Sequence, residues 1–353
     1  MAINPSYSKD SEQEKSAKSC ISLKPEKTKG DESFEASDIK NENNLRPKNF
    51  NSYIGQEKLK TTLRISISAA KKRGETSSFG HLLLYGPPGL GKTSCACLLA
   101  NEFGTQSHVF SAPALQRPKD IIGVLMSLNE GDVLFIDEIH RLNKVTEELL
   151  YPAIEDFHVD LSTGSGSSAR VMRFPINKFV LVGATTKLGF ISAPLRDRFI
   201  HLHRMEYYKE EELAEISKRS AEILGVDLHD EAALSIAKRS RGTPRIVNRL
   251  LRLVRDFSEH HERDQVCSQT AIEALDLYRI DKAGLDPMDR SILETLAKKY
   301  AGGPVGLDTL ATSVGEDRTT LEDYYEPFLI QSGFLQRTQR GRILTPYAYE
   351  YLG

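Results

Sequence analysis

The sequence predicts an α/β fold in which a parallel sheet, covered by helices on both faces, is followed by a small helical domain and a winged-helix domain. Three strand-length apolar runs carry the first part of this prediction, and each ends in Gly or Asp: "HLLLYG" (81–86), "DVLFID" (132–137) and "FVLVGA" (179–184). Helical segments separate these runs, an alternation typical of parallel sheets. The second observation is a helical pattern, without strands, from Tyr208 to about Tyr278. The third is a series of three helical segments and two β-like runs near the C-terminus, the order found in winged helices.

Residues 1–44 differ from the rest of the chain because they are rich in Lys, Glu, Ser and Asn and show no hydrophobic periodicity. We expect them to form a disordered extension. They hold 7 basic and 9 acidic side chains, so they account for the net charge of −2 of the 353-residue chain. No apolar run reaches the roughly 18 residues that span a bilayer, and no secretory signal is present. The expectation is a soluble, cytoplasmic protein that makes no membrane contact.

The first folded domain is expected over residues 45–207, and it opens with a helix. Leu59, Leu63 and Ile67 recur at helical spacing, and Gly74 offers a stop. The three apolar runs follow. Ligands of parallel sheets bind beyond the carboxyl ends of the strands. The residues directly after each run are therefore the candidates for chemistry.

The first such stretch is "GPPGLGKTS" (86–94), which lies between a predicted strand and a predicted helix and fits the pattern G-x-x-x-x-G-K-[ST]. Its glycines allow a tight turn whose backbone N–H groups point at a phosphate, and the helix adds its positive end. The lysine reaches the β- and γ-phosphates, and the following threonine hydroxyl ligates Mg²⁺. The stretch thus predicts ATP and Mg²⁺ as cofactors. The predicted binding residues are Gly86, Gly89, Gly91, Lys92, Thr93 and Ser94.

The second run delivers two acids, Asp137 and Glu138. Asp137 is predicted to hold Mg²⁺ through its water shell, and Glu138 to orient and polarise the attacking water. The third run ends in Thr185 and Thr186, either of which offers a hydroxyl to that water or to the γ-phosphate. His140 is left with two alternatives, sensing the nucleotide state or simply packing.

Two arginines add positive charge where phosphoryl transfer builds up negative charge. Arg198, in "PLRDRFIHLH" (194–203), follows the third run on a loop. If it cannot fold back onto its own site, it reaches a neighbour's, so we predict a subunit boundary there. Arg245 begins a helix of the small domain, from which it could touch the γ-phosphate. The alternative for each is an ordinary surface ion pair.

Taken in order, GPPGLGKTS, DEIHR, GATT, PLRDRF and GTPR resemble the motifs of the AAA+ ATPases. "LRPKNFNSYIGQ" (45–56), "RGTPRIVNRLLRLVRDF" (241–257), "GGPVGLDTLA" (302–311) and "GFLQRTQRGR" (333–342) narrow the resemblance to the RuvB family of Holliday-junction branch-migration motors. The resemblance covers the chain from about residue 45 to its end. It implies an AAA+ P-loop ATPase that works as a homohexamer and pumps duplex DNA of a four-way junction. The implied partners are a RuvA-type junction-binding protein and a RuvC-type resolvase.

The resemblance also implies residue roles. Asp137 and Glu138 are similar to the Walker B pair, and Thr186 to sensor 1. Arg198 is similar to the trans-acting arginine finger, and Arg245 to sensor 2. The positions that match nucleotide-pocket residues are Leu45, Arg46 and Tyr208, and those that match a segment near the neighbouring subunit's nucleotide are Glu155, Asp156 and Phe157.

A projecting hairpin is expected over residues 157–179, where two β-like runs flank Gly164-Ser165-Gly166. By resemblance this hairpin docks RuvA. Its expected tip is small and polar. The apolar surface it offers is limited to Val159, Leu161, Val171 and Met172.

Two positions depart from the family pattern. Ile200 stands where the family usually has glycine after "RDRF", which we expect to stiffen the loop that carries Arg198. Lys187 stands where arginine is usual after "GATT". Neither departure removes a group that the chemistry requires.

The winged-helix domain is expected over residues 279–353, after a lid domain over 208–278. It holds 9 basic and 11 acidic side chains, so any DNA contact must come from a local cluster. The predicted cluster is Arg337, Arg340 and Arg342 in the wing with Arg318 at the third helix. Such phosphate contacts give affinity without sequence readout. The alternative is a solvated hairpin.

Two rival functions remain open at this point. One is a clamp-loader-type AAA+ switch, and the other is an ATP-binding DNA scaffold with little turnover. The predicted winged-helix end argues against the first, because clamp loaders usually end in a helical collar. The presence of Glu138 and Arg198 argues against the second.

Overall fold

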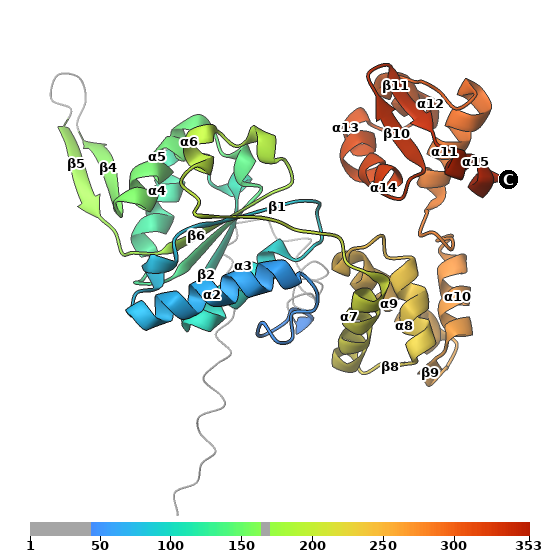
Figure 1. The fold of residues 1–353 in the computed structure, drawn as a ribbon, viewed down its shortest axis with the longest axis horizontal. Helices are drawn as coiled ribbons and strands as arrows, with labels where there is room; N and C mark the ends of the chain where they lie inside the picture. Colours follow the sequence, from blue (N-terminus) through green and yellow to red (C-terminus); the bar gives the residue numbers. More distant parts are fainter. Residues whose placement is uncertain (1–43, 164–169) are drawn as a thin grey trace, which may run out of the picture. The chain divides into compact units, whose positions relative to one another are not determined.

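The computed structural model describes residues 44–163 and 170–353. The predicted N-terminal extension, apart from Asn44, and the predicted turn Gly164-Ser165-Gly166 lie outside these residues. The chain divides into two compact units, with the boundary between Tyr207 and Tyr208 (Figure 1). Among the described residues, none of the helices has the length and apolar character that crossing a bilayer requires.

The first unit is built on a five-stranded sheet whose strands all run parallel, which confirms the predicted sheet. Its three central strands are the three apolar runs, and two further strands complete the edges. In spatial order the strands are β2 (Ser107–Ser111), β3 (Val133–Asp137), β6 (Val180–Thr185), β1 (Leu82–Tyr85) and β7 (His201–Arg204).

Helices cover both faces of this sheet (Figure 1). Helices α2 (Glu57–Arg73) and α3 (Lys92–Phe103) pack together on one face, and α4 (Pro118–Ser127) and α5 (Lys144–Glu155) on the other. Successive side chains of a strand point to opposite faces of the sheet. Leu134 and Ile136, alternate residues of β3, therefore share one buried cluster with residues of α4 and α5. Each fully buried leucine or isoleucine stabilises the fold by about 1.5–3 kcal/mol. The packed sheet therefore gives the residues at its carboxyl edge a fixed support.

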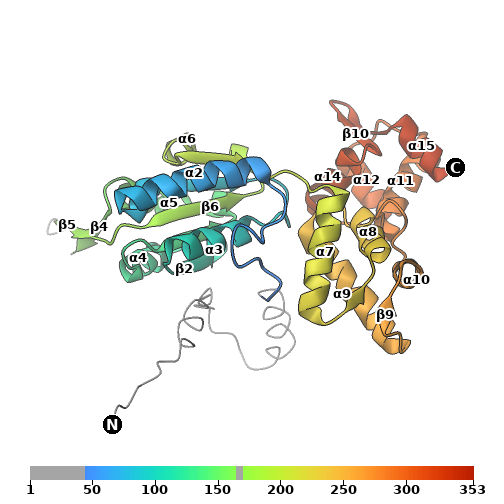
Figure 2. The same ribbon diagram turned by 60° about the horizontal axis from the view of Figure 1, so that its bottom comes forward.

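The predicted hairpin is present as β4 (His158–Thr163) and β5 (Arg170–Pro175), which pair antiparallel and extend away from the sheet (Figure 2). Val159 is fully buried, whereas Val171 and Met172 are exposed. The apolar surface of this hairpin is thus smaller than the sequence predicts.

The second unit begins with four helices, α7 (Glu210–Leu224), α8 (Asp230–Lys238), α9 (Pro244–His260) and α10 (Ser268–Leu277). Thr243 occupies the N-cap position of α9 and a proline follows, as predicted. The expectation of helices alone is wrong in one detail. Two short strands, β8 (Asp227–Leu228) and β9 (Gln265–Val266), pair parallel. Two residues are too few for hydrophobic periodicity to reveal a strand.

The C-terminal part has the predicted three helical segments and hairpin (Figure 1). Thr338 pairs with Gly341, so Gln339 and Arg340 form the turn of the wing. A final helix was not predicted. In order, the elements are α11 (Pro287–Tyr300), α12 (Leu307–Val314), α13 (Arg318–Thr320), the π-turn η7 (Leu321–Tyr325), α14 (Glu326–Gln331), β10 (Leu335–Thr338), β11 (Gly341–Leu344) and α15 (Pro346–Leu352).

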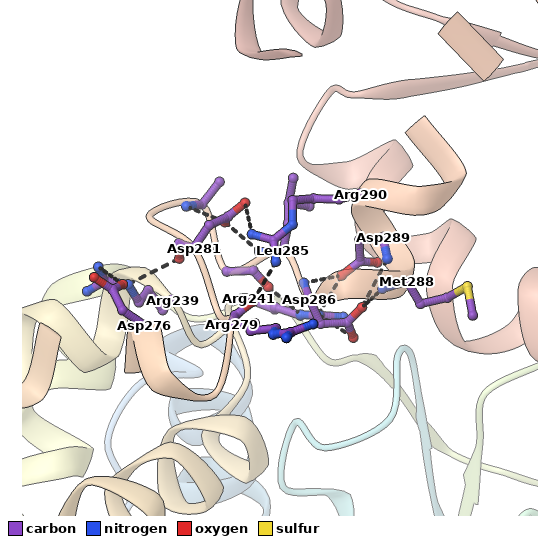
Figure 3. A network of polar contacts seen from close by, with 12 residues as sticks. Arg239, Arg241, Asp276, Arg279, Asp281, Leu285, Asp286, Met288, Asp289 and Arg290 are labelled. Carbon is purple, nitrogen blue, oxygen red and sulfur yellow. Dashed lines mark hydrogen bonds and ion pairs between the residues drawn. The ribbon is translucent and has the colours of Figure 1, made fainter. Parts of the chain in front are cut away.

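A buried polar network joins the four-helix part of the second unit to its C-terminal part (Figure 3). The Arg241 guanidinium donates to Asp289 Oδ2 at 2.6 Å, to Asp286 Oδ2 at 3.1 Å and to the carbonyl oxygen of Gly284 at 3.0 Å. It also lies over the Phe328 ring, 4.6 Å from the centroid. Nearby, the Arg239 Nε donates to the Asp281 carbonyl oxygen. Because Arg241 precedes α9 and Asp289 lies on α11, this network fastens the two parts together.

Candidate functional site

The phosphate loop connects β1 to α3 with the backbone that the motif requires. Gly86, Gly89 and Gly91 all have positive φ angles, of 136°, 80° and 95°. A Cβ atom at Gly86 would lie 2.9 Å from the carbonyl oxygen of Met205, so this position admits no side chain. Gly91 is the N-cap of α3, which directs the positive end of the helix at the loop. The loop therefore has the geometry of an anion site.

Lys92 is the first residue of α3 and is buried. Its ammonium group donates to the carbonyl oxygens of Gly86 at 2.9 Å and Pro87 at 2.8 Å, so it lies inside the loop. Thr93 and Ser94 follow in the first turn of the helix, both half-buried. The residues of this helix that are predicted to bind phosphate and Mg²⁺ therefore lie together in its first turn.

Asp137 is the last residue of β3 and Glu138 follows it, as predicted. Asp137 Oδ1 accepts a hydrogen bond from the Glu138 backbone N–H at 3.0 Å. Glu138 has a φ of 50°, a left-handed conformation that costs a non-glycine residue about 1 kcal/mol or more. The Thr186 hydroxyl donates to Glu138 Oε2 at 3.2 Å. The structure therefore brings the predicted acid and the predicted sensor threonine into contact.

His140 belongs to the same cluster, which the sequence leaves open. Its Nδ1 lies 2.9 Å from Thr185 Oγ1 and 3.1 Å from Glu138 Oε2. Burial lowers the pKa of His140, although Glu138 opposes this shift. A neutral imidazole with one proton can donate to only one of these two oxygens at a time. The Thr185 hydroxyl oxygen also accepts from the Lys187 backbone N–H at 2.9 Å, a contact that does not involve the side chain at position 187.

Arg198 lies against α5 and makes three kinds of contact, two with α5 and one with Pro194 of its own segment. Its Nη2 donates to Glu155 Oε2 at 3.1 Å, and its Nε lies 3.1 Å from Oε1 of the same carboxylate. Its Nη1 donates to the Pro194 carbonyl oxygen at 2.6 Å, and the guanidinium lies 4.4 Å from the Tyr151 ring centroid. Sequence reasoning misses Tyr151. Its place four residues before Glu155 on a helix is the only signal that could have found it.

The other two residues of the segment predicted to lie near the neighbouring subunit's nucleotide differ in exposure. Asp156 is exposed, whereas Phe157 is half-buried with a φ of 52°. Ile200, the departure after "RDRF", extends over Gly80, where a Cβ atom would lie 2.4 Å from Ile200 Cδ1. The loop that carries Arg198 is thus in contact with the segment before β1.

The other predicted pocket residues divide between the two units. In the first unit, Leu45 is buried and Arg46 Nη1 lies 4.0 Å from Cys97 Sγ of α3. In the second unit, Tyr208 is buried and its N–H donates to the Gly242 carbonyl oxygen at 3.0 Å. Arg245 is exposed in the first turn of α9.

The predicted DNA-binding arginines differ in exposure. The side chains of Arg318 and Arg337 are 60% and 57% exposed and pair with Asp308 and Glu322 at 3.3 and 3.2 Å. Arg342 is buried. It donates to both carboxylate oxygens of Glu326, at 2.6 and 3.0 Å. The structure therefore does not place the Arg342 side chain at the surface, because its ion pair with Glu326, 16 residues away, is buried.

Comparisons with known proteins agree along the whole described chain. The family model "Holliday junction DNA helicase RuvB P-loop domain" matches residues 45–205. The models "RuvB AAA lid domain" and "RuvB C-terminal winged helix domain" match residues 208–281 and 282–353.

The similar proteins include several that are named as RuvB subunits. The Holliday junction branch migration complex subunit RuvB of Trichormus variabilis is 52% identical over 314 residues, which cover 89% of this chain and 85% of the relative. That of Crocosphaera subtropica is 52% identical over 312 residues, 88% of each chain. The solved structure of the Thermotoga maritima RuvB Holliday junction branch migration motor has a TM-score of 0.78 and 48% identity, with 88% of this chain and 98% of that chain covered. The chain, with its P-loop ATPase domain, AAA lid and winged helix, belongs to the RuvB family.

Proposed function

We propose that this protein is an ATP-driven DNA motor that pumps duplex DNA to drive branch migration of Holliday junctions. The observation that carries the proposal is the convergence of the phosphate loop, Glu138 and Thr186 at one edge of the sheet, in a chain that is 52% identical to RuvB over 89% of its length. The motor acts in the cytoplasm as a homohexamer. Its partners are a RuvA-type junction-binding protein and a RuvC-type resolvase.

In this function Lys92 and the loop N–H groups hold the β- and γ-phosphates of ATP. The Thr93 hydroxyl and the Asp137 carboxylate offer the oxygen ligands that Mg²⁺ prefers. Bound Mg²⁺ would neutralise part of the charge that develops on the phosphates. Glu138 orients the attacking water, and Thr186 holds the Glu138 carboxylate in place through the bond of 3.2 Å.

Arg198 completes the site of the neighbouring subunit, and Arg245 reports on the γ-phosphate from the lid. Leu45, Arg46 and Tyr208 line the nucleotide pocket. The segment Glu155, Asp156 and Phe157 lies near the neighbouring subunit's nucleotide. The ion pair between Arg198 and Glu155 supports placing that segment and the arginine finger together.

The wing supplies the DNA contact through Arg318 and Arg337, whose guanidinium groups are exposed. Arg340, in the turn of the wing, adds a third charge. Arg342 reaches a phosphate only if that phosphate replaces Glu326 as its partner. The exposed Val171 and Met172 of the hairpin form the contact with the RuvA-type protein.

The domain division that goes with this function follows the predicted boundaries. Residues 1–44 are an extension, and residues 45–207 form the ATPase domain. Residues 208–278 form the lid, and residues 279–353 the DNA-binding head. The division into two compact units at Tyr207 and Tyr208 supports the first of these inner boundaries.

A branch-migration assay tests the proposal. The protein is mixed with ATP, Mg²⁺, a RuvA-type partner and a synthetic four-way junction, and separation of the junction into duplexes is followed. We expect separation with the native chain and none with Lys92→Ala. Stimulation of ATP hydrolysis by a sliding clamp, and not by the junction, would favour the clamp-loader-type switch. Junction binding without appreciable turnover would favour the scaffold.

A further inference from the structure

Three side chains of α5 form a stripe that faces the segment carrying Arg198. Glu147, Tyr151 and Glu155 are spaced four residues apart, so they lie on one face of the helix. Each of them contacts the segment between Ser192 and Arg198. The stripe therefore supports this segment along its length.

The stripe begins by holding the start of α6 (Ala193–Arg196). Ser192 is the N-cap of α6, and its hydroxyl accepts from the Leu195 N–H at 3.2 Å and donates to Glu147 Oε1. The Tyr151 hydroxyl donates to the same Glu147 oxygen at 2.6 Å. One carboxylate thus fixes both the first turn of α6 and the orientation of the Tyr151 ring.

The stripe ends at the guanidinium of Arg198. The Tyr151 ring supports one face of the group at 4.4 Å, and Glu155 binds its edge. A cation over an aromatic ring gains about 0.5–1 kcal/mol at exposed sites and about 2 kcal/mol when desolvated. Glu155 is half-exposed, so a more highly charged anion can displace it from the arginine, whereas the ring leaves the guanidinium edge free for that anion.

We propose that Tyr151 is a positioning residue for the arginine finger, with Glu147 fixing its ring and Glu155 holding Arg198 until a phosphate of the neighbouring subunit replaces it. This inference rests on the proposed trans-acting role of Arg198. The helix α5 starts at Lys144, shortly after Glu138 and His140. It therefore links the catalytic acid of one site to the arginine that serves the next.

The first test is steady-state ATP hydrolysis by the full chain with Tyr151→Leu, which removes the ring. We expect kcat to fall by about tenfold to a hundredfold, the usual effect of misplacing a catalytic group by about 1 Å, with little change in KM. Tyr151→Phe keeps the ring and loses only the contacts of its hydroxyl with Glu147 and Ser192, so we expect a smaller fall in kcat. Glu148→Ala, on the exposed side of α5, is the matched control and retains native turnover.

Mixed rings separate positioning from damage to the fold. Glu138→Gln subunits hydrolyse nothing, yet they keep Tyr151 and Arg198. When they are mixed with Tyr151→Leu subunits, some interfaces join an intact acid to an intact finger, so turnover per Tyr151→Leu subunit rises. Absence of any rise at every ratio overturns the proposal, because it would mean that Tyr151→Leu damages its own site.

Two further results distinguish this inference from the proposed function. If Arg198→Ala stops hydrolysis while Tyr151→Leu retains native kcat, the positioning role is wrong and the shared site stands. If Arg198→Ala itself retains native kcat, the shared site is wrong. Should Tyr151→Leu fail to fold, Glu147→Ala decides. It removes the oxygen that accepts from both the Tyr151 and the Ser192 hydroxyls but keeps the ring, and native kcat in that variant overturns the proposal.

Discussion

Two arginines in different parts of the molecule are bound in similar ways but differ in burial. Arg198 pairs with Glu155 and lies 4.4 Å from the ring of Tyr151. Arg241 pairs with Asp289 (Figure 3). Its guanidinium lies 4.6 Å from the ring centroid of Phe328. The side chains of the first ion pair are 23% and 51% exposed, whereas those of the second are 6% and 0% exposed. An arginine bound to a carboxylate and an aromatic ring therefore occurs once at a partly exposed position and once in a buried network.

The difference in burial decides what each pair can do. A solvent-exposed ion pair contributes about 0–1 kcal/mol to stability, so its partners exchange at little cost. Removing one partner of a buried pair leaves an uncompensated charge and costs about 3–5 kcal/mol. We therefore expect the pair of Arg198 to serve catalysis and the pair of Arg241 to serve structure.

The largest effect is expected from Arg198→Ala on ATP hydrolysis. Loss of an arginine finger costs about 10³- to 10⁵-fold in kcat, because it stabilises the charge of the transition state. Nucleotide affinity, followed by calorimetry, stays close to native. Arg196→Ala, two residues away and paired with its neighbour Asp197 at 3.9 Å, is the control and retains native turnover. A comparable loss in that variant would contradict a specific role for Arg198.

The converse experiment is Arg241→Ala, which removes the guanidinium bonds to Asp289, to Asp286 and to the Gly284 carbonyl oxygen in a buried joint. We expect the free energy of unfolding to fall by about 3–5 kcal/mol in urea denaturation of the full chain. Arg255→Ala removes an arginine of the same unit that pairs with Asp256 near the surface, and we expect it to cost less than about 1 kcal/mol. Equal losses in the two variants would mean that burial does not separate the two classes.

The pH dependence of stability sharpens the comparison at Asp289. Burial raises the pKa of this carboxyl to about 7, against the pull of Arg241. Its Oδ1 is also without a hydrogen-bond partner among the described residues. The folded state thus holds a proton that the unfolded state releases between about pH 4 and 7. The stabilisation from this group is present at the acidic end of that window and is lost as the pH rises through 7.

Thermal and urea unfolding of the native chain and of Asp289→Asn between pH 5 and 8 measures this contribution. We expect the native chain to lose stability relative to the variant as the pH rises, by at most about 1.4 kcal/mol per pH unit. Parallel curves for the two proteins would show that Asp289 stays ionised in the folded state.

The smallest effect is expected from Glu155→Gln on stability. Because Glu155 is half-exposed, we expect the free energy of unfolding to change by less than about 1 kcal/mol. Urea denaturation beside Arg241→Ala provides the measurement. A loss near 3 kcal/mol would place Arg198 and Glu155 in the same structural class as Arg241 and Asp289.

Much of this organisation follows from local sequence. The phosphate loop is a run of adjacent residues, and its glycines and lysine act through backbone geometry that a short motif determines. The acids and the sensor threonine end buried strands, so apolar runs alone place them at one edge of the sheet. The parallel sheet and the winged-helix order could be predicted for the same reason.

The long-range pairings could not be predicted, because they depend on how distant elements pack. Arg241 and Asp289 are 48 residues apart, and neither lies in a motif that predicts a contact with the other. Arg342 shows the opposite failure. Its place on a strand of the basic wing predicts exposure, yet it is buried in an ion pair with Glu326 of helix α14. The sequence does not distinguish Tyr151 from its neighbours in the helix, and its contact with the Arg198 guanidinium emerges only from the structure.

In the proposed motor, Arg198 of one subunit acts on ATP held by the next. ATP turnover in rings mixed from Arg198→Ala and Glu138→Gln subunits tests it most directly, since neither variant alone completes a site. We expect both pure variants to be inactive and turnover to appear in the mixture, highest at intermediate ratios. Turnover that stays at the background level at every ratio would contradict it.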